Sequence, residues 1–563
     1  MNLISGARHI VTGQEVSIRA MTLLTRLAER AWNLPPRRNA VRVTRSIAVP
    51  MRDGVTLVAD HYEPQTRCPA ATILVRSPYG RGAPYSVLYA QLYAERGFHV
   101  VLQSCRGTFG SGGVFDPMRH EADDGQDTVA WLRTQQWFDR RLVTLGLSYL
   151  GFAHWALALD PPPELVAAVV HMGPHDFSKA AYRNGVFDWY NFLGWSETVG
   201  HQHDVGPIRN LVRMATADRR LRVPLQQFPL SRGARTILGD TAPWFDGWLE
   251  HPDLTDRFWA EMQHGAALQR LSVPTLLVGG WHDLFVEQTL EQYAALHQRD
   301  VPVRLVVGSW SHLDFMVRGG PAVAESLAWL ERHAAGEGPT KGPVRVSVGG
   351  GDSWRELTDW PPPESRNELW YLGGGRTLAS TPSGDRDEVT FRYDPRDPTP
   401  TTGGAIMSLR AGARDNHAVE KRDDVVVFTS APLTEPMTVI GEVTARIHVS
   451  RDNPNADLFV RLCDVDRSGR SKNICDGIVR LTDEHPLTGT VQVSLIGAAH
   501  SFAAGHRVRV QIAGAAHPRF ARNPGTGSLD GERADLPSTT YVIVAGGDSG
   551  SAVSLPVYRE VPR

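Results

Sequence analysis

Three residues that together could perform nucleophilic catalysis each follow a short apolar segment of the sequence. Ser148, Asp283 and His312 come shortly after LVTLGL, TLLVGG and VRLVVG, respectively. A serine hydroxyl is unreactive until a base takes its proton, and a histidine held by a carboxylate can act as that base. The three side chains therefore predict a triad in which Ser148 attacks, His312 transfers the proton and Asp283 orients the imidazole.

The surroundings of Ser148 are typical of a nucleophile elbow, a sharp turn between a strand and a helix. Gly146 precedes Ser148 by two residues, where the turn needs a small side chain. Leu150 stands where the G-x-S-x-G pattern has its second glycine, and that glycine is instead Gly151. An ordinary turn with a helix-capping serine is therefore the alternative interpretation of this segment.

The order of the three residues in the chain strengthens the prediction. Hydrolases built on an open α/β sheet carry Ser, Asp and His in this order, after successive strands. Ligands bind such sheets at the carboxyl ends of the strands, where all three residues are expected. His282 is a rival base, but it adjoins Asp283, and side chains next to each other point in different directions. The sequence therefore favours His312.

Two tyrosines are candidates for an oxyanion hole, the set of donors that stabilises developing negative charge. Tyr79 ends the segment VRSPY, which follows a predicted strand. Pro78 has no backbone N–H to donate, but the Tyr79 hydroxyl can donate. The second donor would be the backbone N–H of Tyr149, at the start of a helix. For Tyr79, packing of a loop aromatic on the sheet is the alternative.

Short β-branched segments alternate with helical patterns around these residues. An Asp-Gly turn predicts a hairpin of residues 43–50 and 55–62. The alternation predicts a mostly parallel α/β sheet that is covered on both faces, and an amphipathic helix over about residues 16–33. The expected strands are 71–76, 99–103, 142–147, 165–171, 275–278 and 303–307, and the expected helices are about 84–96, 121–136, 149–159, 287–298 and 322–335.

The chain of 563 residues is too long for a single core. Residues 178–270 are rich in Trp, Phe and Arg, and helical signals such as those of 208–217 predict an inserted helical cap. After the linker-like GEGPTKGP, short strands predict an all-β domain. The expected division is an α/β core in 1–177 and 271–340, a cap in 178–270 and a β domain in 341–563. The strands expected in the β domain are 344–348, 425–429, 438–449, 458–465, 490–495, 507–512 and 541–544.

Composition excludes several classes of protein. The chain has 59 Lys+Arg and 61 Asp+Glu, so it lacks the basic surplus of a nucleic-acid-binding protein. No apolar run approaches 18 residues, so no membrane span is expected. The four cysteines lack metal-ligand spacing, and neither a metal nor another cofactor is expected. Cys463 and Cys475 flank the hairpin signal DVDRSG and could pair, but free thiols and a reducing cytoplasm are favoured.

Several motifs of the chain resemble those of the CocE/NonD serine hydrolases, relatives of X-prolyl dipeptidyl peptidases and α-amino-acid ester hydrolases. The resemblance covers about residues 43–563 and rests on LVRSPYGR, QSCRGTFGSGGVF, EADDGQDTVAWLRTQQW, GLSYLGF, GGWHDLF and VVGSWSH. The family's G-x-S-Y-x-G motif accounts for the glycine spacing around Ser148. The resemblance implies an α/β-hydrolase core with a helical cap and a C-terminal jelly roll. It is also compatible with assembly of the chain into a homodimer. It implies the triad Ser148, Asp283 and His312, with Tyr79 and Tyr149 as oxyanion donors.

The chain departs from the amino-acid ester hydrolases just after Asp283. Those relatives carry part of an amine-binding carboxylate cluster there, whereas this chain has the apolar residues Leu284, Phe285 and Val286. We therefore expect an uncharged substrate and no requirement for an α-amino group. Phe285 is expected to form a wall of the acyl pocket, with Met407 of the loop GGAIMS as a second wall. Other candidates for the pocket, for which burial in the core is the alternative, are Trp155, Phe187, Trp189 and Trp195.

The sequence thus predicts a serine hydrolase that cleaves a small-molecule carboxylic ester, or an amide, through an acyl-enzyme. X-Pro dipeptidyl peptidase or acylase activity at the same triad is one alternative. A protein of another class, a non-catalytic carbohydrate-binding protein that uses the jelly roll, is the second alternative.

Overall fold

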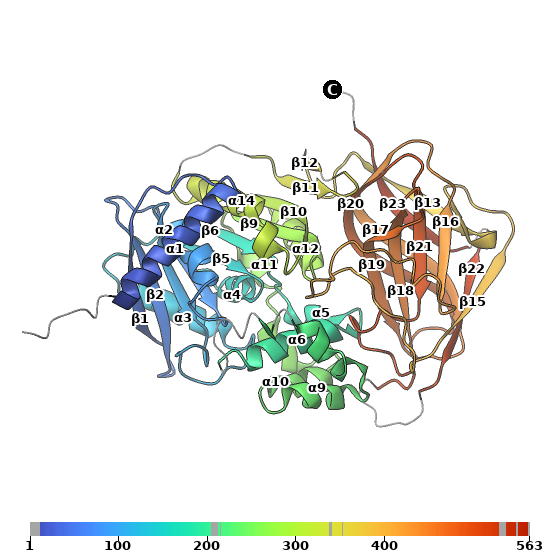
Figure 1. The fold of residues 1–563 in the computed structure, drawn as a ribbon, viewed down its shortest axis with the longest axis horizontal. Helices are drawn as coiled ribbons and strands as arrows, with labels where there is room; N and C mark the ends of the chain where they lie inside the picture. The colour runs from blue at the N-terminus through green and yellow to red at the C-terminus, as the bar shows by residue number, and fades with distance from the viewer. Residues whose placement is uncertain are drawn as a thin grey trace, which may run out of the picture.

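A computed structural model describes residues 12–203, 212–213, 216–336, 341–351, 353–528, 536–547 and 550–560, with side chains from residue 21 onward. An α/β core, a helical cap below it and a β-rich C-terminal domain beside it make up the molecule (Figure 1). Helix α1 (Thr12–Ala31) lies along the outer side of the core and confirms the expected N-terminal helix. It is anchored by Thr25, whose buried hydroxyl donates to Glu95.

The core is built on a ten-stranded sheet with the strand order β1-β2-β4-β3-β5-β6-β9-β10-β11-β12. From β4 to β11 all neighbouring strands are parallel, so the carboxyl ends of β5, β9 and β10 lie at one edge. The hairpin and the six parallel strands expected from the sequence are confirmed. The strands are β1 (Val41–Pro50), β2 (Thr56–Pro64), β3 (Thr72–Ser77), β4 (His99–Ser104), β5 (Leu142–Leu147), β6 (Leu165–His171), β9 (Thr275–His282), β10 (Val303–Ser311), β11 (Val344–Val348) and β12 (Ser353–Leu357).

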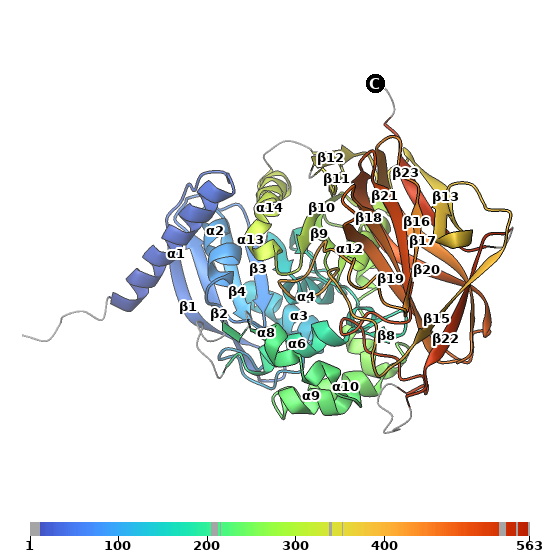
Figure 2. The same cartoon turned by 45° about the vertical axis from the view of Figure 1, so that its right-hand side comes forward.

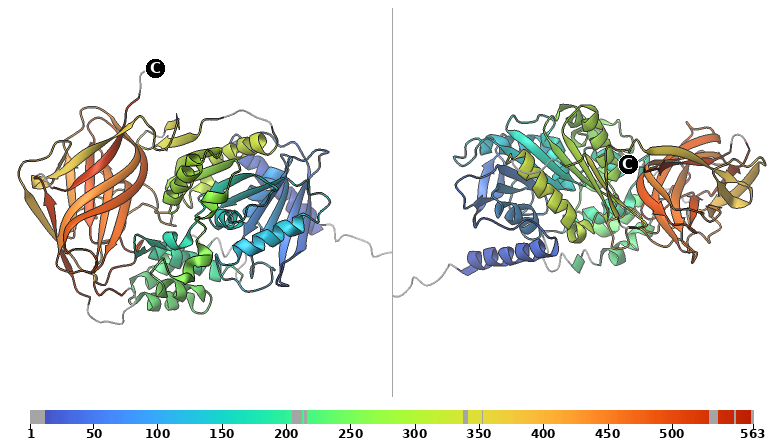
Figure 3. Two further views of the ribbon diagram at one scale, coloured as in Figure 1. Left: turned by 180° about the vertical axis from the view of Figure 1, so that it is seen from behind. Right: turned by 90° about the horizontal axis from the view of Figure 1, so that it is seen from above.

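Helices cover both faces of this sheet (Figures 2 and 3). Because successive strand residues point to opposite faces, Ile73 and Val75 pack into one buried cluster and Leu74 into the other. The first cluster includes residues of α2 and α14, and the second includes residues of α3 and α12. The helices of the core are the π-helix η1 (Ser86–Gln91), α2 (Leu92–Ala94), α3 (Glu121–Leu132), α4 (Tyr149–Leu157), α12 (Val286–Gln298), α13 (Phe315–Arg318) and α14 (Gly320–His333).

The core sheet extends beyond the expected boundary at residue 340. Residues 344–348, which the sequence assigned to the β domain, form β11 and pair in parallel with β10. β12 then pairs antiparallel with β11. The linker-like composition before residue 344 therefore marks a connection within the core, and the assignment of this strand to the β domain was wrong.

The cap is inserted between β6 and β9, as the sequence predicts. It is mostly helical, but β7 and β8 form a short hairpin that the sequence analysis did not predict. The helix expected at 208–217 lies largely outside the described residues. The elements are α5 (Phe177–Ala181), β7 (Tyr182–Arg183), β8 (Val186–Phe187), α6 (Trp189–Gly200), α8 (Ala217–Leu221), η2 (Pro224–Gln226), α9 (Leu230–Leu238), α10 (Trp244–Glu250), η3 (Arg257–Met262) and α11 (Ala267–Arg270).

The C-terminal domain is a β-sandwich around its own apolar core (Figure 3). Apart from β11, every strand expected there is confirmed. β19 was anticipated only through the DVDRSG hairpin signal, and β13, β14, β15 and β23 were not among the expected strands. Antiparallel pairing dominates, as in β17 with β20 and in β18 with β19. The elements are β13 (Ser365–Gly373), η4 (Gly374–Arg376), β14 (Thr377–Ala379), β15 (Asp387–Tyr393), β16 (Val425–Ser430), β17 (Met437–Arg451), β18 (Ala456–Val465), β19 (Ser471–Leu481), β20 (Thr488–Phe502), β21 (Arg507–Ala513), β22 (Thr539–Ala545) and β23 (Ala552–Tyr558).

The β18–β19 hairpin carries Cys463 and Cys475. In its register Cys463 lies opposite Asn473, and Cys475 lies opposite Leu462, so the cysteines are not cross-strand partners. All four cysteines are free, as the sequence favoured. Within the described ranges, no helix has both the length and the apolar character needed to cross a membrane.

Candidate active site

Ser148 occupies the turn between β5 and α4 in a conformation that serine seldom adopts. Its backbone angles are φ 60° and ψ −121°, and its N–H donates to the carbonyl of His171 at 2.9 Å. A non-glycine residue at positive φ is strained and persists only where the surrounding structure holds it. The partly exposed Ser148 side chain is thereby presented at the carboxyl end of β5.

Close backbone packing explains the spacing of the glycines around this turn. A Cβ atom on Gly146 would lie 2.2 Å from the carbonyl carbon of Leu150. A Cβ atom on Gly151 would lie 2.8 Å from the Cα atom of Gly173, which follows β6. Since these obstacles are backbone atoms, they cannot move aside as a side chain could. The second glycine is therefore required at Gly151, one position beyond its place in G-x-S-x-G.

A hydrogen-bonded chain joins the ends of three parallel strands. His312, after β10, places Nε2 3.0 Å from Ser148 Oγ and Nδ1 2.6 Å from Asp283 Oδ2. Asp283, after β9, has no exposed surface, and its Oδ1 accepts the backbone N–H of Phe285 at 2.9 Å. Both carboxylate oxygens are thus held, which fixes the direction from which the imidazole is bound. Because the carboxylate accepts from Nδ1, the tautomer of the neutral imidazole that fits this geometry carries its hydrogen on Nδ1 and leaves Nε2 as the base.

His282, the rival base, faces the β-sandwich. Its Cδ2 atom would lie 3.8 Å from a Cβ atom on Gly412, and Asp476 and Arg461 of the sandwich are among the charges that influence it. Burial lowers the pKa of His282 to about 4. The structure therefore brings His312, and not His282, to the Ser148 hydroxyl.

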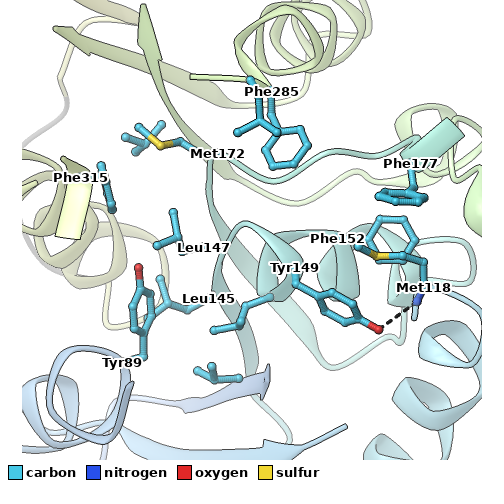
Figure 4. Close-up of a cluster of buried hydrophobic side chains, with 14 of the residues drawn as sticks. Tyr89, Met118, Leu145, Leu147, Tyr149, Phe152, Met172, Phe177, Phe285 and Phe315 are labelled. Atoms are coloured by element: carbon cyan, nitrogen blue, oxygen red, sulfur yellow. Dashed lines mark hydrogen bonds between the residues drawn. The ribbon is translucent and has the colours of Figure 1, made fainter. Parts of the chain in front are cut away.

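Tyr149 offers its backbone and not its side chain to a ligand. Its hydroxyl donates to Glu121 Oε1 at 2.8 Å. The same oxygen accepts the backbone N–H of Met118 at 2.9 Å (Figure 4). Glu121 is itself fixed by a buried ion pair with Arg76 at 2.8 Å. The backbone N–H of Tyr149 donates to no acceptor in the part of the chain that the structure describes. It remains available beside the Ser148 hydroxyl, at the positive end of α4.

The Tyr79 hydroxyl also lies near the nucleophile, close enough for hydrogen bonding with Ser148 to influence it. It accepts the indole N–H of Trp195, from cap helix α6, at 3.0 Å. Burial raises the pKa of Tyr79 to about 12, against the opposing effect of hydrogen bonding with Trp195 and Ser148. The phenol therefore keeps its hydrogen at neutral pH and can donate it. From the sequence, Trp195 was expected only as a pocket candidate, because no local pattern indicates its hydrogen bond with Tyr79.

The remaining pocket candidates fall into two groups. Phe285 packs edge-on to the His312 ring with centroids 5.5 Å apart, and the partly exposed Met407 packs against the same apolar cluster. The backbone N–H of Met407 donates to Asn191 of α6 at 2.7 Å, which connects the sandwich loop to the cap. By contrast, Trp155 is fully buried in the cluster on the other face of the sheet, so the structure does not bring it to Ser148. Phe187 and Trp189 are also fully buried.

Among the described residues, no group of three or more His, Cys, Asp or Glu side chains is arranged to hold a metal ion. The groups gathered around Ser148 are a hydroxyl, an imidazole, a carboxylate and two hydrogen-bond donors. Such an arrangement can support acyl transfer through a covalent intermediate.

Comparisons with known proteins match two successive parts of the chain. The family model described as X-Pro dipeptidyl-peptidase (S15 family) matches residues 53–314. The model described as X-Pro dipeptidyl-peptidase C-terminal non-catalytic domain matches residues 339–553. The cocaine esterase of Rhodococcus sp. (strain MB1 Bresler) is 31% identical over 541 residues, which cover 86% of this chain and 93% of that protein.

Two solved structures show the same fold over nearly the whole chain. An α-amino acid ester hydrolase aligns with a TM-score of 0.78 at 23% identity, and an aminopeptidase from the marine sediment archaeon Thaumarchaeota archaeon aligns with 0.77 at 21%. Each alignment covers 92% of this chain and 97% of the other. The fold and these matches define a hydrolase with an α/β-hydrolase core and an added β-sandwich. More specifically, the chain belongs to the CocE/NonD family of serine hydrolases.

Proposed function

We propose that this chain is a serine esterase that cleaves small, uncharged carboxylic esters through an acyl-enzyme. His312 Nε2 takes the proton of Ser148 as its oxygen attacks the ester carbonyl carbon. Tyr79 O–H and Tyr149 N–H stabilise the resulting oxyanion. When the tetrahedral intermediate collapses, His312 gives the proton to the departing alcohol. Water, activated by the same base, then attacks the ester on Ser148 and releases the carboxylic acid.

The observation that carries this proposal is the continuous hydrogen-bonded chain from Asp283 through His312 to Ser148. The carboxylate stabilises the imidazolium that forms during attack, and the strained turn keeps the hydroxyl within 3.0 Å of the base. A binding protein without catalysis would have no need for this combination of strain and alignment.

The residues next to Asp283 support an ester of an uncharged acid over an X-Pro peptide. Leu284 and Phe285 are buried among apolar side chains. A peptide with a free terminal amine would bring a positive charge to this region, and an unpaired charge in apolar surroundings is strongly disfavoured. The relative with 31% identity is named a cocaine esterase, which agrees with ester cleavage. X-Pro peptidase activity, suggested by the family models' descriptions, is the competing outcome.

Labelling and substrate panels test the proposal. We expect a fluorophosphonate to label the protein stoichiometrically and Ser148→Ala to abolish labelling. The matched control Ser468→Ala, in the β18–β19 turn, should label normally. p-Nitrophenyl esters of graded acyl size should be hydrolysed, with much lower activity on X-Pro anilides. A folded protein that is not labelled would contradict the mechanism, and a preference for the anilides would support the peptidase. Glycan binding without any hydrolysis would favour the carbohydrate-binding alternative.

The homodimer and the cytoplasmic location expected from the sequence stay predictions. Sedimentation of the purified chain over a range of concentrations tests the first, and fractionation of the source cells tests the second.

A further inference from the structure

Trp195 contacts both residues of the proposed oxyanion hole, although it belongs to the cap. Its indole N–H donates to the Tyr79 hydroxyl at 3.0 Å. Its ring is stacked with that of Tyr149, with centroids 6.3 Å apart and an interplanar angle of 11°. The Tyr79 and Tyr149 rings meet edge to face at 6.5 Å. The three aromatic side chains therefore form one cluster that spans cap helix α6, the loop after β3 and the elbow.

The direction of the Trp195–Tyr79 hydrogen bond is fixed by chemistry. An indole N–H can only donate, whereas a phenol has one hydrogen to donate and lone pairs to accept. The Tyr79 oxygen must therefore be the acceptor, and its own hydrogen is left for another partner. Ser148 is the other side chain whose hydrogen bonding with Tyr79 affects the tyrosine's titration. With the Trp195 side of the oxygen occupied, the hydroxyl hydrogen is directed towards the nucleophile.

We propose that Trp195 is a positioning residue for the oxyanion hole: its indole N–H holds the Tyr79 hydroxyl so that the phenol hydrogen faces the carbonyl oxygen attacked by Ser148. This inference rests on the proposed function. A donor that is already aimed at the developing charge needs no reorganisation during the reaction. Accepting a bond from Trp195 also polarises the phenol and strengthens the bond that it donates.

The neighbours of Trp195 support this assignment. Its ring lies 6.1 Å from Trp248 and 6.4 Å from Trp244, which belong to α10 of the cap. The indole N–H of Trp244 is used inside the cap, where it donates to Ser196 at 3.1 Å. Trp195 is thus held on one side by the cap while its N–H extends to the core, which makes the cap part of the catalytic geometry and not only a cover over it.

A double-mutant cycle tests the proposal. The four proteins are the wild type, Trp195→Phe, Tyr79→Phe and the double variant, assayed with one p-nitrophenyl ester. Tyr79→Phe should lower kcat by about 10²–10³-fold, as the loss of an oxyanion donor does elsewhere. Trp195→Phe should lower kcat by about three- to tenfold, the effect of one hydrogen bond, with little change in KM. In the Tyr79→Phe background, Trp195→Phe should have no further effect on kcat.

Controls separate this role from packing. Trp131→Phe changes a tryptophan of α3 that packs against the apolar cluster on the other face of the sheet, so it should leave kcat unchanged. Replacing Trp195 with benzothienylalanine keeps the shape of the ring and removes only the N–H, so it should reproduce the kcat loss even if Trp195→Phe folds poorly. An equal loss in both Tyr79 backgrounds, an effect on KM alone or an unchanged kcat would each overturn the proposal. Fluorophosphonate labelling of Ser148 reports on the proposed function separately, because it does not depend on the outcome of the cycle.

Discussion

Replacing Asp283 with asparagine tests the triad through the orientation of one amide. Asp283 Oδ1 accepts the N–H of Phe285, and Oδ2 accepts the N–H of His312. An asparagine can accept at only one of these two places. If its oxygen faces Phe285, its NH2 group faces His312 Nδ1, which must then become an acceptor. The imidazole hydrogen moves to Nε2, and His312 can no longer take the proton of Ser148.

The size of the effect follows from the alternatives open to the asparagine. The opposite amide orientation keeps the active tautomer but sets its NH2 group against the Phe285 N–H, leaving a buried donor unpaired at a cost of about 1–3 kcal/mol. This free-energy cost alone reduces the fraction of protein molecules that hold His312 in its active tautomer by roughly 5- to 150-fold. Loss of the carboxylate charge, which stabilises the imidazolium, adds to it. We therefore expect Asp283→Asn to lower kcat by about 10⁴-fold, as in the Ser-His-Asp template.

The assay is the hydrolysis of a p-nitrophenyl ester, with kcat and KM measured for both proteins. Asp314→Asn is the matched control, because Asp314 lies two residues beyond His312, is partly exposed and contacts Arg318 at 3.9 Å. That variant should stay within about twofold of the wild type, since exposed ion pairs contribute little. An Asp283→Asn protein that retains a tenth of the activity would show that the carboxylate does not set the tautomer of His312.

Three further predictions follow from contacts around the site. Burial raises the pKa of Asp188 to about 6, so the folded state loses stability as the pH rises from about 4 to 6. Asp188→Asn should therefore raise the free energy of unfolding by about 2–3 kcal/mol at pH 7.5 and change it little at pH 4. Thermal unfolding at both pH values measures the difference. Asn191→Ala removes the acceptor of the Met407 N–H and should change the preference for acyl size across an ester panel while leaving fluorophosphonate labelling intact; an unchanged preference would separate this loop from the pocket. Gly146→Ala places a methyl group against the backbone of Leu150 and should abolish labelling and activity; normal labelling would contradict the packing of the elbow.

The sequence could group the residues of the proposed triad because its signals are local. Ser148, Asp283 and His312 each follow an apolar segment that forms a parallel strand, and parallel strands in one sheet present their carboxyl ends at one edge. Sequence position alone was therefore enough to group them. The contact between Trp195 and Tyr79 joins residues 116 positions apart, and its formation depends on how the cap settles on the core. No periodicity or motif encodes that arrangement.

The errors of the sequence analysis also have physical causes. A tryptophan that completes a core and one that lines a pocket have the same local sequence signature, so Trp155 could not be distinguished from Trp195. The strand at 344–348 follows a Gly- and Pro-containing segment that resembles a domain linker, but its pairing partner is β10 of the core. Strand β13 was not predicted because its exposed and buried residues do not alternate regularly.

The pairing of β11 with β10 constrains how this chain can be synthesised and divided. A ribosome that has made residues up to 340 has made Ser148, Asp283 and His312, yet β10, which leads to His312, still lacks its neighbour on one side. A fragment ending there would present a bare strand edge, which invites pairing with another chain. Moreover, Gly349 after β11 exchanges backbone hydrogen bonds with Ala499 and Ser501 of β20. The α/β core is therefore completed by segments that follow it in the chain, and a cut at the apparent linker would separate parts that contact each other.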